Sequence, residues 1–155
     1  MSKKYDSGAS LHEKILEGIN VLADNVACTY GPRGRNVIIH KKEKRPIITK
    51  DGVTVAKFVD LEDPFANAAV QVVKQAAAKT NVDAGDGTTT STILAREIVR
   101  ASIRHIQNGE SPVELKRGLD RALPIVTSLV AATAKNIRSK DDVRHVATIS
   151  ANNDE

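Results

Sequence analysis

Tryptophan is absent from this sequence, and aromatic residues make up only 3% of its 155 positions. A core built from such a chain must consist of Ala, Val, Ile and Leu, a composition that favours closely packed helices. Cys28 is the only cysteine, which excludes an internal disulfide and fits a reducing cytoplasm. No apolar run approaches the ~18–20 residues of a membrane span, and the N-terminus lacks the apolar stretch of a signal peptide. We therefore expect a cytoplasmic protein with no membrane partner.

Patterns typical of metal sites and covalent nucleophiles are also missing. The four histidines are scattered without zinc-ligand spacing, and there is no G-x-S-x-G motif. Cys28 lies late in a predicted helix, where the helix dipole does not favour a thiolate, so we expect a small buried apolar residue there. These absences leave a zinc enzyme and a serine hydrolase without support.

The charge is not one-sided, because 23 basic residues are mixed with 19 acidic ones for a net charge of +4. The one dense basic cluster spans residues 41–45, between two β-prone runs, and contains no aromatic residue to stack on bases. We interpret it as the solvated tip of a hairpin and expect no nucleic-acid partner. A polyanion binder is an alternative that rests on charge alone.

Helical periodicity dominates the first third of the chain. An apolar stripe predicts a helix over residues 10–29, with a capping box formed by Ser10 and Glu13. Val37–Ile39 and Ile47–Thr49 predict a small hairpin, and Asp51-Gly52 predicts a turn after it. Two strands alone are marginally stable, so we expect them to pair with something else.

Three more helices are predicted downstream. The first begins at Asp63-Pro64, and the second begins at the threonine run 88–90. The third begins with a capping box at Ser111 and Glu114, and Pro124 should kink or divide it. Beyond residue 133 the pattern becomes polar and weak, so the fold class is mainly α with one small β-hairpin. The helix that begins at Asp63-Pro64 has an expected apolar face of Ala66, Ala69, Val70, Val73 and Ala77. The helix that begins at 88–90 has Leu94, Ile98 and Ile106 at helical spacing.

The stretch DAGDGTTTSTILAREI, residues 83–98, begins a helix with residues that are poor helix formers. Gly85 and Gly87 permit a tight turn, and three threonines then fill the first helical turn, where N–H groups lack partners and the dipole favours an anion. Asp86 would repel a phosphate unless a divalent cation lay between them, which is an arrangement suited to Mg²⁺. A simple capped helix start is the alternative, since the motif G-x-x-x-x-G-K-[ST] is absent. Two further turns, at 29–35 and 49–52, could converge on the same ligand.

Several longer segments resemble the N-terminal part of a group I chaperonin of the GroEL type. They are VLADNVACTYGPRGRNV (21–37), ITKDGVTVAK (48–57), LEDPFANAAVQVVKQAAAKTNVDAGDGTTTSTILA (61–95), ELKRGLDRAL (114–123) and ATISANNDE (147–155). The resemblance implies a chaperonin equatorial-domain helical bundle. It implies that residues 1–132 are the first half of the equatorial ATP-binding domain and that residues 133–155 begin the intermediate domain. It also implies an ATP-dependent folding chaperonin subunit that forms homo-oligomeric rings, with unfolded polypeptides and a co-chaperonin as partners.

The resemblance also implies a nucleotide site with ATP, Mg²⁺ and K⁺. Asp51 would be catalytic, near the γ-phosphate and its attacking water, and Asp86 would be the Mg²⁺ ligand. The K⁺ ion is expected near Thr29, Lys50 and Thr90. The residues expected to bind the nucleotide are Thr29, Tyr30, Gly31, Pro32, Lys50, Asp86, Gly87, Thr88, Thr89, Thr90, Ile149 and Ser150.

The sequence departs from the family pattern in two ways. Tyr30 stands where the family commonly has leucine, at a position where the backbone matters most. The polypeptide-binding domain and the later aspartates of the nucleotide site have no counterpart in these 155 residues, so we expect a fragment with negligible ATP turnover by itself. The alternative is a truncated chaperonin-like module that oligomerises or binds nucleotide without ATPase activity.

Overall fold

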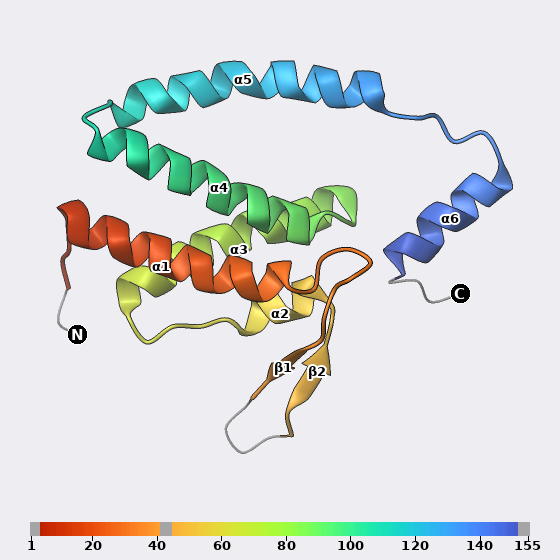
Figure 1. The fold of residues 1–155 in the computed structure, drawn as a ribbon, viewed down its shortest axis with the longest axis horizontal. Coiled ribbons are helices and arrows are strands. Elements are labelled where there is room, and N and C mark those ends of the chain that lie inside the picture. The colour runs from red at the N-terminus through yellow and green to blue at the C-terminus, as the bar shows by residue number, and fades with distance from the viewer. Residues whose placement is uncertain (1–3, 41–44, 152–155) are drawn as a thin grey trace. The chain divides into compact units, whose positions relative to one another are not determined.

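Helices dominate the computed structural model, which describes residues 4–40 and 45–151 (Figure 1). The charged tip predicted at residues 41–45 lies outside the described residues except for Arg45, which is exposed. The chain divides by its internal contacts into two units, Met1–Gly109 and Glu110–Glu155. The elements of the first unit are α1 (Gly8–Ala27), β1 (Val37–Ile39), β2 (Ile47–Thr49), α2 (Gly52–Phe58), α3 (Pro64–Ala84) and α4 (Thr88–Gln107). The second unit contains α5 (Pro112–Thr133) and α6 (Lys140–Ser150).

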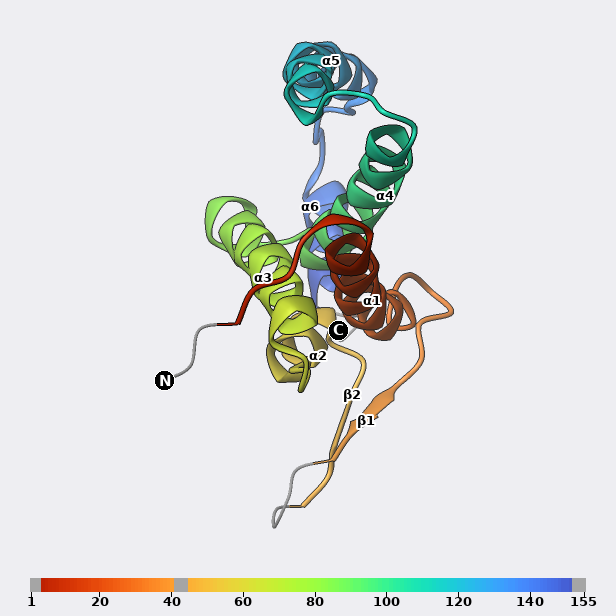
Figure 2. The ribbon, with the colours of Figure 1, turned by 90° about the vertical axis from the view of Figure 1, so that its left-hand side faces the viewer.

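The core of the first unit lies between α1, α3 and α4, with α2 packed against α1 and α4 (Figure 2). Each of the three long helices contacts the other two. The core is aliphatic, as the composition requires, and burying one such side chain contributes about 1.5–3 kcal/mol. The largest fully buried side chains are Leu22, Val26, Val55, Val70 and Thr92.

The hairpin has the predicted strands. β1 and β2 are antiparallel, with Val37 opposite Thr49 and Ile39 opposite Ile47. Ile38 and Ile48 form the central pair and are both exposed on the same face. The structure therefore leaves this apolar face of the two-stranded sheet uncovered among the described residues.

The start of α3 is as the sequence predicts. The Asp63 carboxylate accepts hydrogen bonds from the N–H groups of Phe65 (2.9 Å) and Ala66 (2.8 Å), and Pro64 is the first helical residue. These bonds satisfy two of the N–H groups that have no partner within the helix. The predicted apolar face of α3 is buried: Ala66, Ala69, Val70, Val73 and Ala77.

The predicted capping box at the start of α1 is wrong. The helix begins at Gly8, so Ser10 lies inside it, and the Ser10 hydroxyl donates to the carboxylate of Asp6 (3.3 Å). Lys14 donates to the same carboxylate (2.5 Å), and this bond lowers the pKa of Asp6. The segment before α1 is thus bonded to the first turns of the helix through the carboxylate of Asp6, a residue that the helical pattern did not include.

The exposed and buried sides of α4 differ from the prediction. Leu94 and Ile98 are 56% and 46% exposed, whereas Thr88 and Thr92 are buried together with Ile103. The buried positions follow helical spacing along a stripe that begins with two threonines. An apolar pattern that excludes threonine therefore identifies the wrong side.

The second unit bears on two predictions, the effect of Pro124 and the second capping box. Helix α5 runs without a break through Pro124, so the proline does not divide it. Ser111 precedes α5 without a side-chain cap, and Glu114 pairs instead with Arg117, so the second capping box is wrong. Neither α5 nor α6 has a buried residue.

Helix α6 occupies the region where the sequence pattern is weak. Its capping box is formed by Ser139, which accepts from the Asp142 N–H (3.1 Å), and by the Asp142 carboxylate, which accepts from the Ser139 N–H (3.1 Å). The N–H of Arg138 also donates to this carboxylate (3.0 Å). The Arg138 bond first, and then those from Ser139, lower the pKa of Asp142. The helix start is therefore encoded by local polar bonds rather than by apolar periodicity.

Candidate nucleotide-binding site

Three segments that are far apart in the sequence meet where α1 ends and α2 and α4 begin (Figure 1). Gly52 is the residue that shows their proximity. A Cβ atom added to it would lie 2.3 Å from the Thr89 Oγ1 and 3.2 Å from the Thr29 Oγ1. The structure thus brings together the three turns that the sequence analysis singled out as possible parts of one site.

The loop that follows α1 is closed by its own backbone. The Thr29 N–H donates to the carbonyl of Val26 (3.1 Å), the Tyr30 N–H to that of Ala27 (3.0 Å), and the Arg35 N–H to that of Cys28 (2.7 Å). Because the N–H groups of Thr29 and Tyr30 are engaged in this way, these two residues offer a ligand their carbonyl oxygens. Such oxygens suit a cation or a hydroxyl donor better than a phosphate.

The predicted site residues of this loop differ in exposure. Tyr30, Gly31 and Pro32 are exposed, and the Tyr30 side chain is 56% exposed. Thr29 is half-buried, and its hydroxyl donates to the carbonyl of Val26 (2.7 Å). That bond leaves the lone pairs of the hydroxyl oxygen available to accept from, or coordinate, a ligand.

Asp51 begins a helix that the sequence analysis expected to be a turn. Its carboxylate accepts from the N–H groups of Val53 (3.2 Å) and Thr54 (3.0 Å) and from the Thr54 hydroxyl (2.6 Å), and so caps α2. An ionised carboxylate has about four acceptor positions. With three of them engaged, Asp51 is held in one orientation and can accept one further donor, such as a water molecule. Lys50, the residue before it, is exposed.

The junction between α3 and α4 has the local structure that the sequence predicts. Gly87 adopts a left-handed conformation with φ 89°, and its N–H donates to the Asp86 carboxylate (2.6 Å). Thr88, Thr89 and Thr90 then form the first turn of α4, which contains no acidic residue. The free N–H groups of this turn and the positive end of the helix dipole therefore face no competing negative charge within the turn.

Thr88 provides a direct test of whether an oxyanion fits here. Its side chain is only 6% exposed, and its hydroxyl is buried without a hydrogen-bond partner. A buried hydroxyl without a partner is costly, and a ligand that accepts its hydrogen bond would remove that cost. Thr92, one turn later, has no such deficit because its hydroxyl donates to the Thr88 carbonyl (2.9 Å).

The donor set also bears on Mg²⁺. Asp86 is exposed, and no group of three or more His, Cys, Asp and Glu side chains gathers among the residues that the structure describes. Mg²⁺ commonly binds through one or two carboxylates together with phosphate oxygens. A single carboxylate beside a phosphate cradle fits that mode, whereas it would hold the metal poorly by itself.

Ile149 and Ser150 are the last two residues of α6, in the second unit. Ile149 is 68% exposed. Their contribution to a nucleotide site stays a prediction.

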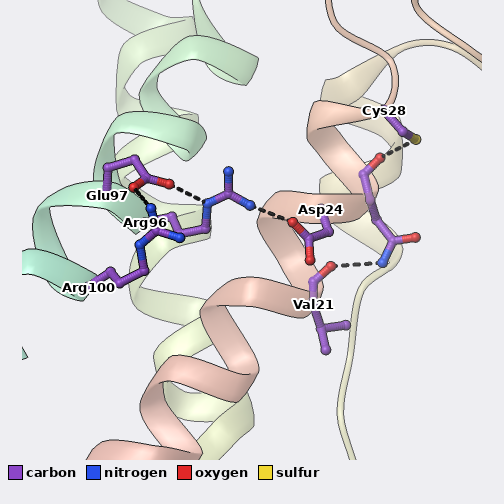
Figure 3. A network of polar contacts seen from close by, with 7 residues as sticks. Val21, Asp24, Cys28, Arg96, Glu97 and Arg100 are labelled. Carbon is purple, nitrogen blue, oxygen red and sulfur yellow. Dashed lines mark hydrogen bonds and ion pairs between the residues drawn. The ribbon is translucent and has the colours of Figure 1, made fainter.

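A network of ion pairs that the sequence does not reveal joins α1 to α4 (Figure 3). Arg96 of α4 pairs with Asp24 of α1 and with the neighbouring Glu97 (3.0 Å), and Glu97 also pairs with Arg100. Asp24 lies one turn before the loop at residues 28–35. The network therefore links the end of α1 to the helix whose first turn carries the threonines.

Cys28 lies on the same stretch of α1 but is exposed, which contradicts the expectation of a buried residue (Figure 3). Its thiol donates to the carbonyl of Asn25 (3.0 Å). The cysteine is the C-terminal cap of α1, where the chain leaves the core.

Sequence reasoning also missed the close approach of Gly52 to Thr89. The only signal for it in the sequence is that this glycine directly follows the aspartate that caps α2.

The family model of the TCP-1/cpn60 chaperonin family matches residues 22–155. The chain belongs to this family. Among solved structures, a group III chaperonin in the open state matches with a TM-score of 0.77 and 26% identity. The match covers 94% of this chain and 29% of that one, so the chain spans less than a third of the length of that chaperonin.

The comparisons confirm two predictions, membership of the chaperonin family and the fold of an equatorial-domain helical bundle with a small hairpin. None of the helices among the described residues is long and apolar enough to cross a bilayer.

Proposed function

We propose that this chain supplies the phosphate-binding part of an ATP-dependent folding chaperonin of the group I type. In this proposal residues 1–132 belong to the equatorial domain and residues 133–155 begin the intermediate domain. The complete protein would be cytoplasmic, would form homo-oligomeric rings, and would bind unfolded polypeptides with the help of a co-chaperonin. The chaperonin family and its related fold support the class of protein, and the geometry of the site supports the use of a nucleotide.

The observation that carries the proposal is the unpartnered hydroxyl of Thr88 in the first turn of α4. It lies in a turn whose backbone N–H groups are oriented for an anion, next to the Thr89 hydroxyl that contacts Gly52. In a simple capped helix start this hydroxyl keeps the cost of a buried, unpaired donor. A phosphate oxygen would satisfy it.

Each predicted residue has a role that its environment allows. Gly87, Thr88, Thr89 and Thr90 would hold the phosphates, and Asp86 would hold Mg²⁺ against them. The single free acceptor position of Asp51 would orient the attacking water near the γ-phosphate. Bound ATP supplies the phosphoanhydride bond that is hydrolysed.

Further contacts are proposed around this centre. Lys50 would lie beside the phosphates, while Thr29, Tyr30, Gly31 and Pro32 would line the nucleotide through their backbone. K⁺ would bind near Thr29, Lys50 and Thr90, where the carbonyl oxygens of the 28–35 loop suit a cation. Ile149 and Ser150 would approach from the intermediate domain.

Isothermal titration calorimetry with Mg·ATP tests the assignment of Asp86. We expect the wild-type chain to bind, and Asp86→Ala to weaken binding by about tenfold or more, a loss of about 1.4 kcal/mol, because the metal loses its protein ligand. Asp83→Ala is the matched control, since Asp83 is an exposed carboxylate three residues earlier in α3.

Two results would contradict the proposal. Equal affinities for the wild type and Asp86→Ala would show that this carboxylate is not the metal ligand. An absence of binding by the wild type at millimolar Mg·ATP would show that these residues do not form a phosphate site.

The alternative is a chaperonin-like module that oligomerises without hydrolysing ATP. It is favoured by the uncovered apolar residues of α5 and of the hairpin, such as Leu123, Leu129 and Ile38. Sedimentation analysis distinguishes the two, because self-association that is independent of Mg·ATP, together with no calorimetric binding, favours the module.

A further inference from the structure

Gly52 occupies the point where the starts of α2 and α4 meet, and it is buried there. We infer that Gly52 is a positioning residue: its missing side chain lets α2 close on α4 so that the Thr89 hydroxyl and the Asp51 carboxylate lie at one site. This inference rests on the proposed nucleotide site, because it assigns a role to a residue that supports that site.

Space, rather than backbone conformation, requires the glycine. Gly52 is the first residue of a regular helix and is not one of the glycines with positive φ, so any residue could adopt its conformation. An added Cβ, however, would lie 2.3 Å from the Thr89 Oγ1, which is well inside van der Waals contact. It would also lie 3.2 Å from the Thr29 Oγ1 and 3.4 Å from a methyl group of Val26.

Two of these three neighbours cannot yield easily. Val26 is fully buried in the core, and the Thr29 hydroxyl is held by its bond to the Val26 carbonyl (2.7 Å). Thr89 is half-buried in the first turn of α4, and threonine in a helix has two accessible χ1 rotamers. An added methyl group at position 52 would therefore rotate the Thr89 hydroxyl away or push the start of α2 outward.

Either response changes the proposed site. Rotation of Thr89 removes a hydroxyl from the phosphate cradle. Displacement of α2 moves Asp51, because Asp51 precedes Gly52 directly and its carboxylate is bonded to the first turn of that helix. The contact thus links the carboxylate proposed to orient water with the turn proposed to bind phosphate.

A double-mutant cycle tests the contact without nucleotide. In the full chain we expect Gly52→Ala to lower the Tm by about 2–4 °C, the shift for a clash near the lower end of the overpacking range. Thr89→Ala removes the clashing oxygen, so the combined variant Gly52→Ala/Thr89→Ala should melt close to Thr89→Ala alone. Gly118→Ala is the control, because a Cβ at that exposed position of α5 meets no atom within 4 Å. Tm changes that simply add, or a double variant that does not recover, would overturn the contact.

Calorimetry with Mg·ATP then tests the positioning role, at a temperature where each variant is folded. Gly52→Ala should bind about tenfold more weakly than the wild type, and Gly118→Ala should bind equally well. A lower Tm with unchanged affinity would leave Gly52 a purely structural residue and overturn the inference alone. An absence of binding by the wild type would refute the proposed function and the inference with it.

Discussion

Replacing Thr88 with valine should stabilise the chain when no nucleotide is present. The hydroxyl of Thr88 is buried without a partner, and a buried polar group in that state costs about 1–3 kcal/mol. Valine has nearly the same shape and a similar helix propensity, so the substitution removes the polar group and keeps the packing. We therefore expect the free energy of unfolding to rise by about 1–3 kcal/mol, which raises the Tm by at least about 2 °C in a chain of 155 residues.

The same substitution should weaken the response to Mg·ATP. A ligand at one hundred times its Kd stabilises a protein by about 2.7 kcal/mol, and this gain appears as a rise in Tm. The wild type should show such a rise, whereas Thr88→Val should show a smaller one because one donor to the phosphate is lost. Differential scanning calorimetry, with and without Mg·ATP, measures both quantities on the same samples.

Thr92→Val is the matched control for this experiment. Thr92 is fully buried one turn later, but its hydroxyl donates to the Thr88 carbonyl (2.9 Å). Removing a satisfied hydrogen bond should destabilise the chain by about 0.5–1.5 kcal/mol, which is a change of opposite sign. If Thr88→Val is destabilising without nucleotide, its hydroxyl has a partner in solution, and the reasoning from an unpaired donor is refuted.

The ion pair between Asp24 and Arg96 should contribute modestly, because the Asp24 side chain is 70% exposed. A double-mutant cycle with Asp24→Asn and Arg96→Gln, followed by urea denaturation, should give a coupling energy of about 0–1 kcal/mol that shrinks at about 1 M salt. A coupling that is insensitive to salt would show that packing rather than charge joins the two helices. The start of α6 should depend on pH, because the pKa of Asp142 is lowered in the folded chain. Its stabilisation is then complete above the unfolded value of about 4 and is lost as the pH falls through the lower folded value, so helicity by circular dichroism should decrease below about pH 4. Asp142→Asn should lack this transition, and an unchanged pH profile in that variant would contradict the assignment.

Local signals predicted the parts of the fold that depend on neighbouring residues. Asp63-Pro64 marks the start of α3 because a carboxylate cap and a proline both act within one turn. The hairpin strands at 37–39 and 47–49 follow from two short β-prone runs. These features need no partner from elsewhere in the chain, so the sequence is sufficient to locate them.

Predictions failed where a side chain has two possible hydrogen-bond partners, or where it carries both a polar and an apolar group. Ser10 and Glu13 have capping-box spacing, yet α1 begins at Gly8, since Ser10 bonds to Asp6 instead. Leu94 is exposed and Thr92 is buried, because packing against α1 and α3 selects the face of α4. Hydropathy ranks leucine above threonine, but Thr92 lies on the side of α4 that this packing buries.

The sequence by itself determined that three threonines follow Gly87 at a helix start, and it therefore predicted a first turn whose N–H groups suit an anion. Only the tertiary structure decided that Thr29 and Thr89 both lie beside Gly52, because the three residues come from segments that are far apart in the chain. The same holds for the unpartnered state of the Thr88 hydroxyl, which depends on what surrounds it rather than on its neighbours in sequence. Backbone preferences act over a few residues and can be read locally, whereas burial and close approach are set by how whole helices pack.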